Sequence, residues 1–387
     1  MECCVFLFLL KTLFSYVIWF FWFLTVAYAL FLLTGLVTWS RKDRWAEVDS
    51  ETETVTVIVP FRNEQSQLAA LVAHLQNQTY QRFGVIFIND HSTDNSVEVL
   101  EKALLNVGFE HQLVHLKEAT GKKAAIAAGA MAADGGLILT TDADCEFGQD
   151  WITEMVKPFQ EPTIQMVAGP VALTGKRLFQ RWQKMEFATL QAIGAILIRK
   201  GHPSMANGAN LAYRKSAFEA VAGFEGIDQT PSGDDELLLM KVQNAFPGSI
   251  TFRKAAGAMV TTAALERWQD FKNQRLRWAS KWQVGRRRSA MSVALFVFVL
   301  NLSWFLLPLL AFAGLVSSDD VLGIWRLRFV IEALWVMWLT RFFVSALSIR
   351  AFYLHQFLYP VYVIYFGLMA NFGNYHWKGR SYKVRWQ

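Results

Sequence analysis

Several aspartates follow short apolar runs of the kind that form buried strands. Asp90 comes after the run VIFIN, Asp142 and Asp144 come after LILTT, and Asp234 and Asp235 form an adjacent pair farther along. In an open α/β sheet, ligands bind beyond the carboxyl ends of the strands, so acids at those ends face one crevice. Clustered carboxylates repel each other unless a cation or a proton is shared among them. The spacing therefore predicts a metal-dependent site for a phosphate-bearing ligand.

Short apolar runs alternate with amphipathic stretches between residues 53 and 260, which is typical of βαβ units in a mostly parallel sheet. We expect Pro60 to end the first strand, because proline cannot donate to a β-ladder. The expected strands are Val55–Val59, Gly84–Ile88, Gln112–Leu116, Leu137–Thr140 and Gln165–Ala168, and the expected helices lie near 65–77, 94–106 and 122–133.

Two common nucleotide-binding loops are missing from the sequence. No GxGxxG follows the first strand and no GxxxxGK[ST] occurs anywhere in the chain. These absences argue against a dinucleotide-binding fold and against a phosphate-loop fold. Three polar segments stand at the predicted strand ends instead: VPFRNE, NDHSTD and TTDADC.

The composition predicts that part of the chain lies in a lipid bilayer. Of its 387 residues 53% are hydrophobic, whereas soluble domains have about 45–50%. The excess is concentrated in residues 5–38 and 291–371, and residues 40–288 resemble a soluble domain. The first run is too long for the apolar core of a signal peptide and long enough for one tilted membrane helix. We therefore expect an integral protein of a bacterial-type inner or plasma membrane.

Basic residues flank the central region on both sides. Arg41, Lys42 and Arg44 follow the first apolar run, and 286–288 are all arginine. Under the positive-inside rule this places the central domain in the cytoplasm. The flanks also account for the net charge of +6, and no basic stripe suggests nucleic-acid binding. The three cysteines have neither zinc nor disulfide spacing, as expected in a reducing compartment.

The C-terminal apolar region has one clear span and two ambiguous stretches. Residues 291–315 predict a span, a turn is expected at 317–320, and 329–347 and 352–371 are apolar but interrupted. Three spans would place the basic tail outside, whereas its charges favour the inside, so one of the last two stretches is re-entrant or interfacial. The interrupting Glu332 and Arg341 are polar enough to line a functional groove.

Seven segments make the chain resemble the family 2 glycosyltransferases. In that family's order they are VPFRNE, NDHSTD, GKKAAIAAG, TTDAD, NGANLAYRKSAF, GDDE and QRLRW, and they cover roughly residues 53–283. The resemblance implies an α/β domain of the GT-A fold, with a Rossmann-like mixed, mostly parallel sheet. The expected organisation is an anchor at 1–40, this domain at 41–288 ending in an interfacial QxxRW helix, a transmembrane region at 289–375 and a basic tail at 376–387.

The resemblance also implies roles for individual residues at the donor site. Asp90 matches the family aspartate that binds the base of the nucleotide, which is usually uracil. Asp144 matches the ligand of Mg²⁺ or Mn²⁺, with Asp142 beside it, because alternating side chains of an extended segment point the same way. The implied nucleotide contacts are Pro60, Arg62, Glu64, Asp90, Lys122, Lys123 and Asp142.

The remaining matches concern the acceptor and the chemistry. Asp235 matches the family's general base, with Asp234 in place of the usual preceding glutamate; because Asp234, Asp235 and Glu236 are consecutive, the family pattern alone fixes this register. Acceptor or diphosphate contacts are implied for Asn207, Gly208, Gln274, Arg277 and Trp278. The QxxRW segment also suits an amphipathic helix at the membrane surface.

These matches imply an inverting, metal-dependent transferase. It would move a sugar from a nucleotide sugar, most simply a UDP-sugar, to a hydroxyl of a lipid or membrane-associated glycan. A processive polysaccharide synthase is the alternative within the family, and the small number of C-terminal spans argues against a translocation channel. A catalytically silent scaffold that binds nucleotide sugars is a remote alternative, because every segment keeps its acids.

Overall fold

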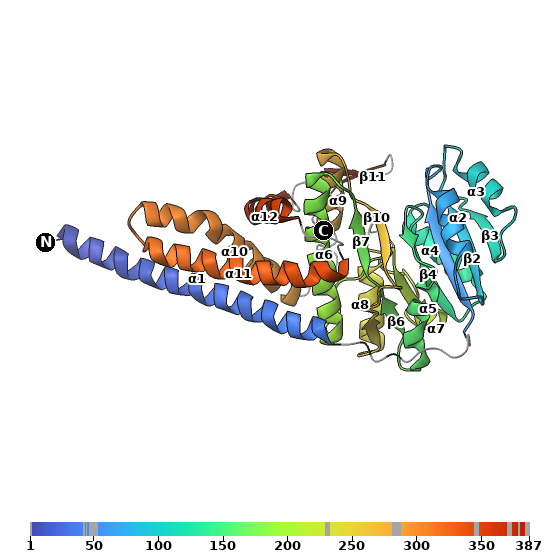
Figure 1. Cartoon of the computed structure of the whole chain (residues 1–387), viewed down its shortest axis with the longest axis horizontal. Coiled ribbons are helices and arrows are strands. Elements are labelled where there is room, and N and C mark those ends of the chain that lie inside the picture. The colour runs from blue at the N-terminus through green and yellow to red at the C-terminus, as the bar shows by residue number, and fades with distance from the viewer. Residues whose placement is uncertain are drawn as a thin grey trace. The chain divides into compact units, whose positions relative to one another are not determined.

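The computed structural model describes residues 2–41, 43, 45, 53–228, 233–280, 288–343, 348–369, 374–377 and 380–383. These residues form two compact units, each described here by itself. The sheet unit consists of described residues of Arg41–Glu266 together with Phe342 and Phe343. The helical unit contains α1 (Glu2–Ser40), α9 (Trp268–Ser280), α10 (Arg288–Phe312), most of α11 (Ser318–Phe343), α12 (Ile349–Met369) and the hairpin of β11 (Asn374–Trp377) and β12 (Arg380–Lys383) (Figure 1).

A seven-stranded sheet with the order β3-β2-β1-β4-β8-β6-β9 forms the centre of the sheet unit. Only β8 runs antiparallel to its neighbours. The strands are β1 (Val55–Phe61), β2 (Phe83–Asn89), β3 (Glu110–His115), β4 (Leu137–Thr140), β6 (Met166–Ala168), β8 (Leu211–Arg214) and β9 (Ile250–Phe252) (Figure 1). This mixed, mostly parallel sheet confirms the predicted fold class.

The strand order reverses between β1 and β4. The chain moves outward from β1 to β3 through α2 (Leu68–Gln76) and α3 (Ser96–Leu104), and then returns through α4 (Lys122–Ala132) to β4. Right-handed crossovers therefore place α2 and α3 on one face and α4 on the other. The point where the order reverses lies beyond the carboxyl ends of β1 and β4, where open α/β sheets bind ligands.

The prediction that Pro60 ends the first strand is wrong. β1 continues to Phe61, and Pro60 pairs in register with Ile88 of β2. The carbonyl of Ile58 accepts a hydrogen bond from Thr141 on the β4 side, and residues two apart point the same way. The missing N–H of Pro60 therefore faces the β4 side, where strand pairing has already ended at Ile58. Proline costs no ladder bond at this position.

The expected strands at Val55, Gly84, Gln112, Leu137 and Gln165 and the three expected helices are all present, with ends shifted by a few residues. The sequence did not reveal a second sheet, in which β10 (Val260–Ala263) lies between β5 (Glu146–Phe147) and β7 (Val171–Thr174). It also missed the long helix α6 (Leu178–Arg199). The remaining helices of the unit are α5 (Trp151–Val156), η1 (Lys157–Gln160), α7 (Lys215–Ala220) and α8 (Glu236–Ala245).

An ionic network holds Asp43, which follows α1 in the chain, against the sheet unit. Its carboxylate pairs with Arg199 at the end of α6 and, at 3.0 Å, with Arg253 after β9. It also accepts the backbone N–H of Lys254 at 2.8 Å. Arg253 pairs in turn with Glu154 of α5. The side chains of Asp43, Arg199 and Arg253 are between 9% and 13% exposed, so water screens these pairs weakly.

Replacing Asp43 with Asn is expected to destabilise the protein by about 3 kcal/mol, because two buried guanidinium groups lose a partner. The thermal unfolding temperature of the purified protein in detergent would fall by about 5 °C. The matched control is Glu266→Gln, which removes an exposed pair with Arg177 and should leave that temperature nearly unchanged. Equal unfolding temperatures for both variants would contradict a structural role for Asp43.

The helical unit has an apolar core and a largely apolar surface. Side chains of α1, α10 and α11 form the core: Ile18, Phe21, Leu24, Leu300, Leu307, Val321 and Ile324. Other apolar side chains of the same helices are exposed, for example Trp19 at 70% and Phe23 at 69%. Two segments, Thr12–Ser40 and Ser292–Phe312, are long and apolar enough to cross a membrane. These features favour the predicted anchor at 1–40 and the predicted span at 291–315.

The predicted turn at 317–320 is displaced, because α11 already begins at Ser318. The hydroxyl of Ser317 accepts a hydrogen bond from the N–H of Asp319 at 3.2 Å. Asp319 and Asp320 lie in the first turn, where negative charge interacts favourably with the helix dipole. α11 also contains the predicted groove residue Glu332, which lies 3.5 Å from buried Arg328. The guanidinium of Arg341 lies over the ring of Trp338.

Candidate functional site

The loops after β1 and β2 fix each other by hydrogen bonds. The side-chain oxygen of Asn63 accepts the N–H of Thr93 at 2.8 Å, and the N–H of Asn63 donates to Ser92 Oγ at 3.1 Å. Asn63 has a φ of 54°, a left-handed conformation that asparagine tolerates better than most residues. The side-chain oxygen of Asn89 accepts the N–H of Ser92. Hydrogen bonds thus link the VPFRNE and NDHSTD segments into one edge at the carboxyl ends of β1 and β2.

Asp90 lies at this edge and is only 6% exposed. Its Oδ2 accepts the N–H of Gly121, the residue before α4, at 3.0 Å. Gly121 has a φ of 98°, which glycine adopts without strain. Arg62 donates from Nη1 to the backbone carbonyl of Asp90 at 3.1 Å. The predicted base-binding aspartate is therefore connected through Gly121 to the N-terminus of α4, where the next predicted residue, Lys122, begins the helix.

Lys122 brings two of the predicted acids together. Its Nζ lies 2.5 Å from Oδ1 of Asp142 after β4 and 3.2 Å from Oδ2 of Asp234 before α8. Burial alone would lower the pKa of Lys122, but the carboxylates of Asp142 and Asp234 raise it, and the net shift of the pKa is upward. Lys122 therefore keeps its positive charge at neutral pH. Asp142 and Asp234, separated widely in sequence, share this one cation.

Asp235 is held by backbone N–H groups at the start of α8. Its Oδ1 accepts the N–H of Glu236 at 2.7 Å, and its Oδ2 accepts the N–H of Gly208 at 3.3 Å. Gly208 is fixed in turn by Thr140, the last residue of β4, whose hydroxyl donates to the Gly208 carbonyl at 3.0 Å. The NGAN segment thus connects the end of β4 to the acidic pair.

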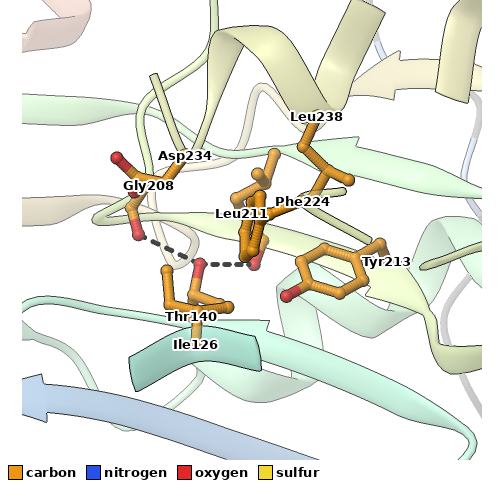
Figure 2. Close-up of a pocket in the computed structure, with 8 residues that line it drawn as sticks. All are labelled: Ile126, Thr140, Gly208, Leu211, Tyr213, Phe224, Asp234 and Leu238. Atoms are coloured by element: carbon orange, nitrogen blue, oxygen red, sulfur yellow. Dashed lines mark hydrogen bonds between the residues drawn. The ribbon is translucent and has the colours of Figure 1, made fainter. Parts of the chain in front are cut away.

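Gly208 also lines a small pocket beside the acidic pair (Figure 2). Figure 2 shows the hydroxyl of Thr140 between the carbonyls of Gly208 and Leu211, with the ring of Tyr213 on the far side. The pocket is lined by Ile126, Thr140, Gly208, Leu211, Tyr213, Phe224, Asp234 and Leu238. Tyr213 was not expected from the sequence. Burial first, and the charge of Asp234 second, raise the pKa of its phenol, which therefore stays protonated.

Replacing Gly208 with Ala is expected to lower both stability and activity. A Cβ at this position would lie 2.6 Å from Oδ2 of Asp234 and 3.1 Å from Nζ of Lys122, so the pair would have to move. Strain of this kind costs about 1–3 kcal/mol. Gly108→Ala is the matched control, because a Cβ at Gly108 meets nothing within 4 Å. Thermal unfolding and turnover should change only for Gly208→Ala; equal values for the two variants would contradict this packing.

Asp144 lies two residues beyond Asp142 and is exposed. Its Oδ2 accepts a hydrogen bond from the hydroxyl of Thr262 in β10 at 3.2 Å, a contact that was not predicted. Among the residues that the structure describes, no three His, Cys, Asp or Glu side chains form a group that could hold a metal ion. The expectation that Asp142–Asp144 is extended is wrong, because the N–H of Cys145 donates to the carbonyl of Asp142 at 3.2 Å and the segment forms a turn. It stays a prediction that both carboxylates bind one hard cation, with donor phosphates and water completing its coordination. Mg²⁺ has this preference.

Lys123 and Asn210 stand next to site residues in the sequence, and both bond to the backbone of other segments. The ammonium of Lys123 donates to the backbone carbonyl of Ile227, so it is directed differently from Lys122. Asn210, the last residue of NGAN, is fully buried. Its amide donates to the carbonyls of Pro170 and Ala258 and its oxygen accepts the indole N–H of Trp151.

The predicted QxxRW residues Gln274, Arg277 and Trp278 lie on α9, which belongs to the helical unit. In that helix the guanidinium of Arg275 is buried between the rings of Phe271 and Trp278, 4.4 Å and 4.2 Å from their centroids. Arg275 also donates to Oε1 of Gln274 at 2.6 Å. The contacts of Gln274, Arg277 and Trp278 with the acceptor or the diphosphate stay predictions.

Comparison with known proteins connects this site to one family. Residues 56–222 match the sequence profile of Glycosyl transferase family 2. An undecaprenyl-phosphate 4-deoxy-4-formamido-L-arabinose transferase from Aeromonas hydrophila is 33% identical over 112 residues, which are 28% of this chain and 34% of that protein. A poly-beta-1,6-N-acetyl-D-glucosamine synthase from Staphylococcus aureus is 29% identical over 148 residues, which are 38% and 35% of the two proteins. The chain spans about a third of the length of these curated relatives.

A solved structure shows the same fold. The mannosyltransferase PcManGT from Pyrobaculum calidifontis, in complex with GDP-Man and Mn²⁺, superposes with a TM-score of 0.59 at 16% identity, over 93% of this chain and 98% of that one. The predicted family and fold are thus confirmed. Residues 56–222, which carry Asp90, Lys122, Asp142 and Gly208, match glycosyltransferase family 2, so the family prediction is confirmed for this part of the chain.

Proposed function

We propose that the protein transfers a sugar from a nucleotide sugar to a hydroxyl of a lipid or a membrane-associated glycan. The observation that carries this proposal is the shared ion pairing of Asp142 and Asp234 with Lys122, next to the hydrogen bond from Gly121 to Asp90. This arrangement supports the proposed roles of Asp90 as the base-binding acid, Lys122 as the phosphate-binding cation and Asp234 and Asp235 as the catalytic acidic pair. Such a site suits a ligand that carries both a base and a diphosphate.

Each part of the site has a task in the proposed reaction. Asp90 accepts hydrogen bonds from the donor's base, and Lys122 at the N-terminus of α4 binds the diphosphate. A divalent ion at Asp142 and Asp144, Mg²⁺ or Mn²⁺, would offset the charge of the departing diphosphate. Asp235 accepts the proton of the acceptor hydroxyl while that oxygen bonds to the anomeric carbon and the carbon–oxygen bond to the diphosphate breaks. Attack from the face opposite the leaving group inverts the anomeric centre.

The donor is proposed to be a UDP-sugar, and the test includes other bases. Purified protein in detergent would be incubated with UDP-sugars and GDP-sugars, Mn²⁺, and a polyprenyl phosphate or a glycolipid as acceptor. We expect nucleoside diphosphate release that requires the acceptor and is fastest with one UDP-sugar. Release with GDP-sugars alone would correct the base, and no release with any donor would contradict the proposed function.

A processive synthase is the second candidate, because relatives of both kinds match part of the chain: an undecaprenyl-phosphate 4-deoxy-4-formamido-L-arabinose transferase and a poly-beta-1,6-N-acetyl-D-glucosamine synthase. Mass spectrometry of the product separates the two. A single added sugar supports single transfer, whereas a ladder of regular mass increments supports polymerisation.

We also propose that the sheet unit faces the cytoplasm from a bacterial inner or plasma membrane. The basic residues that follow α1 in the chain support this orientation under the positive-inside rule. Protease accessibility in inside-out and right-side-out vesicles tests it. Cleavage within 53–266 is expected only when the cytoplasmic face is exposed.

A further inference from the structure

Lys122 lies between two acids of the proposed donor site, Asp142 and Asp234. Its ammonium contacts Asp142 and Asp234 at the same time, and its side chain is only 18% exposed. Asp234 is 7% exposed, and Gly208 approaches both members of the Lys122–Asp234 pair so closely that even a methyl group would collide with them. The ammonium is therefore an internal cation of the acidic cluster.

Asp142 is a proposed metal ligand, but its carboxylate already pairs with the ammonium of Lys122. A hard divalent ion would bind a carboxylate oxygen at about 2.1 Å, and the ammonium of Lys122 already lies 2.5 Å from Oδ1 of Asp142. An ion on either oxygen of this carboxylate would lie within a few ångströms of the ammonium, and two cations so close repel each other strongly. Asp234 is not part of the conflict, because its contact with Lys122 lies on the buried side, under Gly208.

We propose that Lys122 is an exchangeable counter-ion. It holds Asp142 while no donor is bound and moves to the donor diphosphate when metal and donor bind, and Asp142 is then free to ligate the metal. This inference rests on the proposed function and adds to it how the binding of metal depends on the binding of donor. Metal alone binds weakly because it must displace the ammonium, whereas metal and diphosphate bind together because the diphosphate receives the ammonium. The two ligands are therefore coupled through Lys122.

Electron paramagnetic resonance of free Mn²⁺ tests this coupling without measuring turnover. Wild type, Lys122→Met and the control Lys102→Met, which changes an exposed lysine of α3, would be titrated with Mn²⁺ in the absence and presence of UDP. We expect Lys122→Met to bind Mn²⁺ alone at least about tenfold more tightly than wild type does. UDP should tighten Mn²⁺ binding strongly in wild type and in Lys102→Met, and only slightly in Lys122→Met. Equal affinities of wild type and Lys122→Met for Mn²⁺ alone would overturn the proposal.

A second pair of variants separates the occupation of Asp142 by Lys122 from the general electrostatic effect of removing one positive charge. If Lys122 acts by occupying Asp142, the gain in Mn²⁺ affinity from Lys122→Met disappears in an Asp142→Asn background. If it acts only through its field, the gain persists and the exchange is refuted. Should Lys122→Met fail to fold because Asp234 loses its partner, Lys122→Met/Asp234→Asn removes both charges and carries the same expectations.

Failure of the inference and failure of the proposed function are distinguishable. If wild type binds Mn²⁺ with no help from any nucleoside diphosphate and shows no transfer, both are wrong. If wild type transfers sugar with Mn²⁺ and its coupling to UDP survives in Lys122→Met, only the counter-ion exchange is wrong.

Discussion

Replacing Asp235 with Asn is expected to lower the turnover number about 1,000-fold while donor binding is retained. The asparagine cannot accept the proton of the acceptor hydroxyl, and loss of a general base costs about 10²- to 10⁴-fold. Its side-chain oxygen can still accept the N–H of Glu236, so the start of α8 is preserved. Initial rates with saturating donor and acceptor, together with titration calorimetry for UDP, measure both effects.

Glu236→Gln is the matched control, because it removes the neighbouring carboxylate in the first turn of α8. We expect it to keep most of the turnover. The pair also tests the register of the three consecutive acids. Full turnover in a folded Asp235→Asn protein would remove Asp235 as the base, and loss of turnover in Glu236→Gln alone would move the base by one residue.

Replacing Asp144 with Ala is expected to lower the affinity for Mn²⁺ and the turnover at least about 100-fold, because loss of a group that merely supports a metal ligand already costs 10- to 100-fold. The change removes a carboxylate that is exposed and held by the hydroxyl of Thr262. In the wild type, EDTA should abolish turnover, and Mn²⁺ or Mg²⁺ should restore it. The loss of metal affinity is measured by titrating wild type and variant with Mn²⁺ and recording the turnover at each concentration.

The control for this experiment is Glu146→Gln, which neutralises an exposed acid two residues farther along the chain. Its metal dependence should equal that of the wild type. If Asp144→Ala and Glu146→Gln have the same metal dependence, or if wild type is fully active in EDTA, the metal assignment is contradicted.

The strands β1, β2 and β4 were predictable because each is a largely apolar run that is mostly buried. β4 (Leu137–Thr140) was predicted with its observed ends, and β1 and β2 differed by one or two residues. The strands β5, β7, β9 and β10 are two to four residues long, too short for a periodic pattern. The continuation of β1 past Pro60 was not predictable, because it depends on where pairing with β4 ends, which is a property of the assembled sheet.

The position of a site residue was predictable where the residue stands at a strand end. Asp90 and Asp142 follow β2 and β4, whereas Asp234 precedes α8, and the structure connects the three through Gly121 and Lys122. Contacts between distant segments had no local signal. Thr262 on Asp144 and Tyr213 beside Asp234 are examples, and so is the different direction of the adjacent Lys122 and Lys123 ammonium groups, which depends on the rotation of α4.

The central claim is that acids distant in sequence meet at one metal-bound diphosphate. Anomalous diffraction from crystals grown with UDP and Mn²⁺ tests it most directly. We predict one Mn²⁺ peak about 2 Å from a carboxylate oxygen of Asp144 and from a diphosphate oxygen, with uracil against Asp90 and the ammonium of Lys122 on the diphosphate. Nucleotide bound elsewhere, or bound at Asp90 with no Mn²⁺ at Asp144, would contradict the account.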